Sequence, residues 1–460
     1  MRRFLLVLLV VVLGSTARAE DPRVLTRIAF GSCANQDKPL PIFDTIAAAK
    51  PELLLLLGDN MYADLDKNVK VTPDVIREKY AQMEKVPGFV KLKALCPILG
   101  TWDDHDYGKN DAGVEWEHKD EAQQAFLDFF GVPKNHPRRQ QKGVYHAEIF
   151  GPPGKRVQII LLDTRYFRSP IKTFFDTKTR INTYVPNTDA DATLLGNEQW
   201  KWLEEQLRKP AELRLLVSSI QVISDNHPFE KWANIPKERE KLYALINSTQ
   251  ANGVIILSGD RHLGEVSLDT KAVGYPLYDV TSSGFNQGAK RWREPERNDK
   301  RLAAMPYGDN FGFITIDWNG DDPRVHVQLR DEDGDATAGF KVRLSTLKGT
   351  GVATVPSKLP EGVLSPADAA KKVGERVTVQ FVVQSVGGKT NLYLNSDKDF
   401  RAKDNFAIVL APKAQRGQWE KAGPETFVGK TVRATGTVRL NKDSPQLVID
   451  DAKDLVLIEK

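Results

Sequence analysis

Short apolar runs that break abruptly into polar residues dominate the first two thirds of the chain. The clearest run, Leu53 to Leu57, ends at Gly58 and is followed by Asp59. Five apolar residues bounded by glycine predict a strand buried on both faces, as in the middle of an α/β sheet. Similar runs precede Cys33, the cluster Asp103 to Asp106, and the segment Asp260 to His262. Because open α/β sheets carry their chemistry at the carboxyl ends of strands, we expect these four ends to meet.

Helical periodicity between these runs supports the α/β class. Thr72 is a predicted N-cap for a helix reaching Glu84, with Pro73 at its first position. A second helix is predicted for Lys119–Phe130, with Ala122, Ala125, Phe126 and Phe129 on one face. The polar, Thr-rich stretch from Phe174 to Asp189 predicts a long loop beside the site. Further helices are predicted at 41–50, 195–207 and 236–248, and further strands at 27–30, 143–150, 156–162, 213–219 and 254–257. Period-two alternation in residues 276–330 predicts antiparallel strands that complete a layered core.

A break in composition separates a second domain. The stretch from Leu347 through Pro356, Pro360 and Pro366 lacks periodicity and has the Pro and Gly content of a linker. Beyond it, five short strands predict a small all-β barrel or sandwich: 376–386, 390–395, 405–411, 431–440 and 446–449. The expected organisation is a signal peptide at 1–19, a main domain at 20–345, a linker at 346–365 and a β domain at 366–460.

The first nineteen residues have the pattern of a secretory signal. Arg2 and Arg3 precede an apolar run from Phe4 to Leu13, and Ala17-Arg18-Ala19 resembles a cleavage site. The alternative, an uncleaved anchor, is disfavoured because a spanning helix needs about 20 apolar residues. We therefore expect an exported protein, whether periplasmic, cell-surface or extracellular, with no transmembrane segment after cleavage. Loss of three arginines lowers the formal net charge of +4 to +1, so charge does not indicate a partner.

Two cysteines, Cys33 and Cys96, leave two interpretations open. By count alone, an exported chain with two cysteines favours one disulfide. By position, Cys33 closes a strand where a ligand belongs, whereas Cys96 precedes Pro97 and has the context of a small core residue. A thiolate needs an electropositive neighbour, which a metal supplies. We expect Cys33 to be a metal ligand.

The polar residues at the strand ends form a mixed ligand set. Carboxylates suit a divalent ion such as calcium or manganese, while phenolate and thiolate suit trivalent iron. The candidates are Cys33, Asp59, Tyr62, Asp104, Asp260 and His262. Two cations roughly 3.5–4 Å apart can bridge a hydroxide and clamp a phosphoryl group during in-line displacement. The set therefore predicts a binuclear site that hydrolyses phosphate esters.

Four ordered motifs resemble those of the PhoD-like alkaline phosphatases, in the calcineurin-like metallophosphoesterase superfamily. The resemblance covers about residues 25 to 345. The four motifs are Gly31-Ser32-Cys33, Gly58-Asp59-Asn60-Met61-Tyr62, Trp102-Asp103-Asp104-His105-Asp106 and Gly259-Asp260-Arg261-His262. It implies a metallophosphoesterase-type β-sandwich flanked by helices. It also implies iron(III) at Cys33, Tyr62 and His262, a bridging Asp59, and calcium, rather than manganese, at Asp104 and Asp260. His105 would be the acid for the leaving oxygen, and Arg165 would grip phosphate.

Some assignments stay open at this stage. Asp103 and Asp104 compete for one ligand position, and Asp104 is preferred because it precedes His105. His105 could itself bind metal. Related superfamily enzymes supply a further histidine near Val217–Gln221, where this chain has none, and His227 is left unassigned.

The C-terminal strands weakly resemble bacterial OB-fold modules of secreted proteins, which bind nucleic acid or sugar in some cases. Contact with a cell surface or polymer is therefore a possible role. The favoured function is an exported, monomeric phosphoesterase acting on monoesters, diesters or both. The alternatives are a secreted polymer-binding protein with an idle metal domain, and an enzyme of the same fold acting on another substrate.

Overall fold

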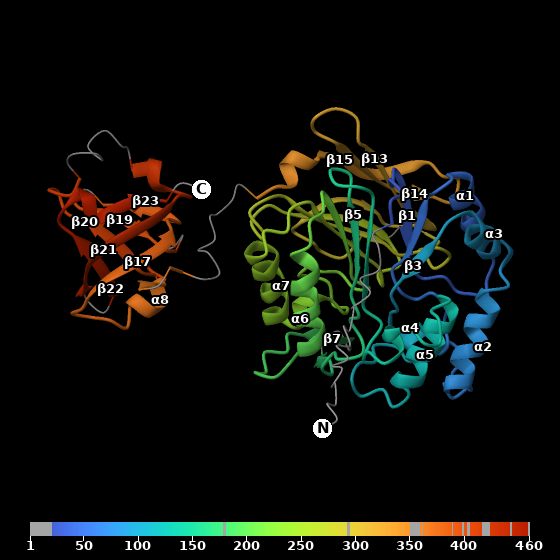
Figure 1. Cartoon of the computed structure of the whole chain (residues 1–460). Coiled ribbons are helices and arrows are strands. Elements are labelled where there is room, and N and C mark those ends of the chain that lie inside the picture. The colour runs from blue at the N-terminus through green and yellow to red at the C-terminus, as the bar shows by residue number, and fades with distance from the viewer. Residues whose placement is uncertain are drawn as a thin grey trace, which may run out of the picture. The chain divides into compact units, whose positions relative to one another are not determined.

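The computed structural model divides the chain into two compact units (Figure 1). The first comprises residues up to 242 with 252–269 and 277–347, and the second comprises 243–251, 270–276 and the residues from 348 onward. The residues described are 21–177, 181–291, 295–349, 359–360, 362–388, 390–397, 400–402, 405–415, 424–441 and 444–458. The predicted signal peptide at 1–19 and half of the predicted linker at 346–365 lie outside them, so these boundaries stay predictions. Within those ranges, no helix has the length and apolarity required to span a bilayer.

A six-stranded sheet carries the first three motifs. Its order is β15-β14-β13-β1-β2-β3. The strands are β1 (Arg27–Gly31), β2 (Leu53–Leu56), β3 (Ile98–Gly100), β13 (Asn310–Asp317), β14 (Arg324–Asp331) and β15 (Ala336–Arg343). β1, β2 and β3 are parallel, whereas β13 pairs antiparallel with β1. Every residue of β2 is buried, as the apolar run predicts.

A seven-stranded sheet carries the fourth motif. Its order is β12-β10-β11-β9-β8-β5-β4, and β11, β9, β8 and β5 are mutually parallel. The strands are β4 (His146–Phe150), β5 (Val157–Leu161), β8 (Leu213–Val217), β9 (Val254–Ser258), β10 (Gly264–Asp269), β11 (Leu277–Ser282) and β12 (Arg301–Met305). A bridge between Ser32 and Ser283 joins the strand ends of the two sheets.

Helices cover the sheets as the apolar periodicity predicts. They are α1 (Ile42–Ala48), α2 (Pro73–Met83), α3 (Pro87–Leu95), α4 (Asp104–Tyr107), α5 (Lys119–Phe129), α6 (Gly196–Leu207) and α7 (Pro236–Ser248). The Thr72 hydroxyl caps α2 by accepting from the Val75 amide. In α5, the predicted apolar face, including Phe126, is buried in the core that also contains Leu54 and Leu56 of β2.

The expected loop at 174–189 is partly wrong. Residues there form an antiparallel hairpin of β6 (Lys172–Asp176) and β7 (Ile181–Val185). Threonine and aromatic residues favour extended backbone even where no clean alternation marks a strand, which explains the error. The Tyr184 amide donates to the Pro228 carbonyl over 3.1 Å, so the hairpin is tied to the segment that follows β8.

The C-terminal unit is an all-β structure with its own apolar core, as expected. Its sheet order is β16-β17-β21-β22-β20-β19-β18, with β23 paired to β21. The elements are β16 (Val363–Leu364), α8 (Pro366–Ala369), β17 (Arg376–Val382), β18 (Ser385–Gly387), β19 (Leu392–Asn395), β20 (Ala407–Leu410), β21 (Thr431–Asn441), β22 (Ser444–Ile449) and β23 (Leu455–Leu457). Phe381, Leu394 and Ile408 belong to the core. The OB-like assignment stays a prediction.

Candidate metal centre

The four motifs meet where parallel strands of the two sheets end. Backbone hydrogen bonds join the turns directly: the Ala34 amide donates to the Asp59 carbonyl over 2.9 Å, and the Gly259 amide donates to Ser219 over 2.9 Å. Phe285 and Gly284 donate to the Ser32 carbonyl from the segment after β11. The expectation that strand ends bring these residues together is therefore met by the geometry.

Several of the assembled residues have a left-handed backbone. The φ angle is +65° at Cys33, +48° at Asp59, +68° at Asp260 and +52° at His262. Among non-glycine residues such angles are uncommon, and each costs of order 1–3 kcal/mol unless the surroundings enforce it. In the described part of the chain, the other non-glycine residues with this conformation are Lys50, Asp111 and Gln250. Strain is thus concentrated at the candidate ligands, as is typical of functional sites.

One group of potential ligands contains Cys33, Asp59 and His262, whose donor atoms all lie within 4.8 Å of one another. The Cys33 thiol lies 3.4 Å from Asp59 Oδ2, and the Tyr62 hydroxyl lies 3.1 Å from the same oxygen and 3.2 Å from His262 Nε2. Burial raises the pKa of Cys33 to about 11, and burial together with Asp59 raises the pKa of Tyr62. Both groups therefore need a nearby cation to ionise at neutral pH.

Two further groups share members with the first. One contains Asp59, Asp104 and His105, and the other contains Asp103, Asp104 and Asp260. Burial, followed by the charge of Cys33, raises the pKa of Asp59, and burial with the charge of Asp104 raises the pKa of Asp260 to about 7. Because Asp59 belongs to two groups, it lies between two adjoining ligand clusters. Burial thus makes Asp59 and Asp260 hard to ionise, and bound cations would relieve that cost.

The two aspartates left open by the sequence have different surroundings. Asp103 Oδ1 accepts from Arg165 Nε over 2.6 Å and from the Ser219 hydroxyl over 2.7 Å. Asp103 and Asp106 also form a capping box at the start of α4. Asp104, in contrast, accepts from two backbone amides, those of Asp111 at 2.7 Å and of His105 at 3.0 Å. These contacts favour Asp104 as the ligand and Asp103 as a structural residue.

Arg165 lies beside the cluster but is fully buried, with 0% of its side chain exposed. Its guanidinium pairs with Asp103 on one side and with Glu230 over 2.6 Å on the other, and Arg168 pairs with Glu230 over 2.9 Å. The resemblance implies that Arg165 grips phosphate. Its guanidinium contacts two carboxylates here, so the phosphate-binding role stays a prediction. Sequence reasoning missed Glu230, because it lies in an irregular segment that no apolar run or motif marks.

His105 packs against the candidate ligand Tyr62, with ring centroids 4.4 Å apart and ring planes tilted by 33°. Its Nδ1 lies 2.5 Å from an Asp64 carboxylate oxygen, a partner that the sequence did not indicate. Burial alone would lower the pKa of His105, but the charges of Asp104, Asp59 and Asp64 outweigh it and raise the pKa to about 11. The His105 side chain is 15% exposed, so solvent reaches the ring.

Positions that the sequence left unassigned lie outside the ligand groups. Ser219, near the expected place of a further histidine, hydrogen-bonds Asp103 and Thr164. His227 is buried, and its Nδ1 accepts from the Phe229 amide over 3.3 Å. Burial, followed by the charges of Arg261, Lys231 and Arg301, lowers the pKa of His227. Both cysteines are free and buried, and Cys96 belongs to the apolar core around β2.

Asp163 fixes the turn that carries Arg165. Its two carboxylate oxygens accept from the amides of Val144, Arg165 and Tyr166 over 2.8–2.9 Å. We expect Asp163→Ala to lower the free energy of unfolding by about 3 kcal/mol or more, because three buried donors lose their acceptor. Asp163→Asn keeps Oδ1, so it should lose less. A denaturant titration tests this, and a change below about 1 kcal/mol for the alanine variant would contradict it.

The sequence model of the PhoD-like phosphatase family matches residues 28–272, which is more than half of the chain. The chain belongs to this family. The resemblance carried by the four motifs is thereby confirmed. Alkaline phosphatase D of Bacillus subtilis (strain 168) is 24% identical over 272 residues, covering 51% of this chain and 45% of that relative. The chain thus matches less than half the length of this curated relative.

A solved structure of PhoD supports the fold. It matches with a TM-score of 0.55 at 18% identity and covers 74% of each chain. The expected α/β architecture of this PhoD-like family member is therefore confirmed, together with a separate C-terminal β unit.

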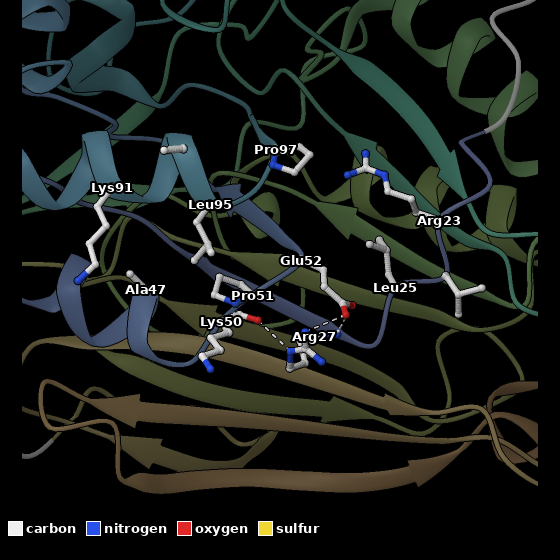
Figure 2. A pocket seen from close by; sticks show the side chains of 12 residues that line it. Arg23, Leu25, Arg27, Ala47, Lys50, Pro51, Glu52, Lys91, Leu95 and Pro97 are labelled. Atoms are coloured by element: carbon white, nitrogen blue, oxygen red, sulfur yellow. Dashed lines mark hydrogen bonds and ion pairs between the residues drawn. The ribbon is translucent and has the colours of Figure 1, made fainter.

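A separate pocket of about 800 Å³ lies at the opposite ends of β1 and β2, among the residues shown in Figure 2. Arg27, at the start of β1, donates to the Lys50 carbonyl over 2.8 Å and pairs with Glu52 over 2.9 Å. Since the ligand groups follow the carboxyl ends of the same strands, this pocket is no part of the candidate metal centre.

Proposed function

We propose that this PhoD-like protein is an exported phosphoesterase with two metal ions, hydrolysing phosphate monoesters, diesters or both. The observation that carries the proposal is Asp59, which is shared by two adjoining groups of buried ligand atoms in a chain of this family. A shared carboxylate is what two neighbouring cations require. The raised pKa values of Cys33, Asp59 and Asp260 support the same proposal, because cations would relieve the cost of ionising these groups.

The ligand set fits two different ions. Cys33, Tyr62 and His262 would hold iron(III), since thiolate, phenolate and imidazole suit that ion. Asp104 and Asp260 would hold a divalent ion, calcium rather than manganese, because hard carboxylate oxygens suit it. Asp59 would bridge the two. The intact set argues against the alternative of a polymer-binding protein with an idle metal domain.

The ions, when bound, would polarise the phosphoryl oxygens and activate water as the nucleophile. His105, held at Nδ1 by Asp64, would give the proton on Nε2 to the departing alkoxide oxygen. Arg165 would supply a fixed positive charge behind the carboxylates, while its pairs with Asp103 and Glu230 keep it in place. The signal-like residues 1–19 support export, and a surface or polymer contact for the C-terminal unit and a monomeric state belong to the same proposal.

Metal content and turnover test this function on one sample. The exported protein, purified without chelator, is analysed by mass spectrometry and assayed with a nitrophenyl phosphate monoester and the matching diester. We expect about one equivalent of iron, a second divalent metal, visible tyrosinate-to-iron absorption and turnover of at least one ester. Metal-free, inactive protein with a Cys33–Cys96 disulfide would refute the proposal.

A further inference from the structure

Three phenylalanines in the β6–β7 hairpin and in the segment after β8 are exposed to solvent. Phe174 and Phe175 of the β6–β7 hairpin are 60% and 52% exposed, and Phe229, in the segment after β8, is 42% exposed. Single exposed aromatic residues are ordinary, but these belong to two segments that are hydrogen-bonded to each other through Tyr184 and Pro228. The two linked segments therefore leave aromatic side chains in solvent that the fold itself does not bury.

Hydrogen bonds connect the β6–β7 hairpin to the candidate ligands. The Tyr184 hydroxyl donates to the Asp111 carboxylate, and the Asp111 amide donates to Asp104 Oδ2 over 2.7 Å. Only one residue thus separates β7 from a proposed ligand of the divalent ion. Figure 1 shows β7 at the same end of the first unit as α4, which begins at Asp104.

The strand register divides the two hairpin phenylalanines between opposite faces. Thr173 pairs with Tyr184 and Phe175 pairs with Asn182, so Phe175 and Tyr184 share one face. Diagonal neighbours of this kind lie within reach of aromatic side chains. Phe174 pairs with Thr183 and points to the other face. Since Tyr184 reaches Asp111 and hence the metal centre, Phe175 is on the side of the centre and Phe174 is not.

Phe229 approaches the centre from the other sheet. The guanidinium of Arg261 lies 4.3 Å from the centroid of the Phe229 ring and donates to Glu296 over 2.9 Å. Arg261 stands between two proposed ligands, Asp260 and His262. A cation–aromatic contact of this kind fixes the Phe229 ring against a residue flanked in sequence by two proposed ligands, while much of Phe229 stays exposed to solvent.

We propose that Phe175, Tyr184 and Phe229 form an aromatic subsite for the organic group of the phosphate ester, selecting esters of aromatic or other flat apolar alcohols over small alkyl esters. This inference rests on the proposed phosphoesterase function. Aromatic side chains stack on flat groups without needing a particular hydrogen-bond pattern. The acidic side chains of the centre do not bind a flat apolar group, so selectivity for such a group must come from the aromatic residues of the proposed subsite.

Binding of non-hydrolysable analogues tests the subsite apart from turnover. The metal-loaded full chain is titrated calorimetrically with phenylphosphonate and with methylphosphonate, and kcat/KM is measured for phenyl phosphate and methyl phosphate. The variants are Phe175→Ala, Phe229→Ala and, as the matched control on the opposite face, Phe174→Ala. We expect Phe175→Ala to weaken phenylphosphonate binding about 10-fold and methylphosphonate binding less than about 2-fold, as for the loss of one stacking partner. Phe174→Ala should change neither.

The possible failures are distinguishable. Equal binding of both phosphonates by the unmodified protein, or equal losses in the Phe174 and Phe175 variants, would overturn the subsite. Selective loss in the Phe175 variant without turnover of any ester would support the subsite and refute the phosphoesterase function. Turnover that Phe175→Ala changes equally for both esters would refute the subsite and leave the function standing. Thermal melts check folding, which these exposed substitutions should not alter.

Discussion

Replacing Asp59 by asparagine will lower kcat/KM for phosphate esters by at least about 1000-fold, because two cations would lose a shared carboxylate and each contributes several kcal/mol of transition-state stabilisation. The neutral amide retains the shape of the side chain, so the fold should persist. Metal content measured by mass spectrometry should fall for both ions. Loss of one ion with the other at full occupancy would contradict a bridging position for Asp59.

The same substitution should have the opposite effect on the metal-free protein. The pKa of Asp59 is raised in the folded state, first by burial and then by the Cys33 charge, so burying the ionised carboxylate costs stability at neutral pH. Asparagine removes that cost, and metal-free Asp59→Asn should melt at a higher temperature than the metal-free original. Asp66→Asn, at an exposed position in the same loop, is the control. It should change neither kcat/KM nor the melting temperature of the metal-free protein.

Replacing His105 by alanine should slow esters of alkyl alcohols by 100-fold to 10,000-fold, since a general acid typically contributes about that much. Nitrophenyl esters should lose less than about 10-fold, because nitrophenolate leaves without needing a proton. The measurement is kcat/KM over a series of esters whose alcohols differ in pKa. A steeper dependence on that pKa in the variant identifies the proton donor.

Two further measurements separate this role from metal binding by His105. Metal content should be unchanged in His105→Ala, and a lost equivalent would make His105 a ligand. Asp64→Asn should reproduce the dependence on the alcohol in weaker form, since Asp64 lies 2.5 Å from the other ring nitrogen. An Asp64 variant that loses the same fraction of activity with every ester would contradict the proton-donor assignment.

The sequence predicts those parts of the site that follow buried strands. A run such as Leu53 to Leu57 predicts a strand because a strand covered on both faces contains few polar residues. Parallel strands, in turn, have their carboxyl ends at one edge of the sheet. The assembly of Cys33, Asp59, Asp104 and Asp260 follows from that rule. Helices with one apolar face could also be predicted from the sequence, as α5 demonstrates.

What the sequence could not predict depends on irregular backbone. Glu230 and Asp64 pair with Arg165 and His105 from segments that have no periodicity, so nothing marks them as partners. Buried Arg165 is hydrogen-bonded to Glu230 and Asp103, which are 65 and 62 positions away in the sequence. The β6–β7 hairpin was missed because its residues alternate poorly, although their propensity favours strands.

The hydrogen bond between the Cys33 thiol and the Ser283 hydroxyl, 3.1 Å long, joins residues 250 positions apart. Closing so long a loop is slow, because the chain loses conformational entropy before the contact forms and stabilises the structure. The β1 end can therefore adopt its final conformation only after the chain has been made beyond Ser283. Until then, the Cys33 thiol lacks its contact with the Ser283 hydroxyl. If the proposed metals bind at Cys33, we therefore expect them to bind late in the maturation of the molecule, after both sheets have formed.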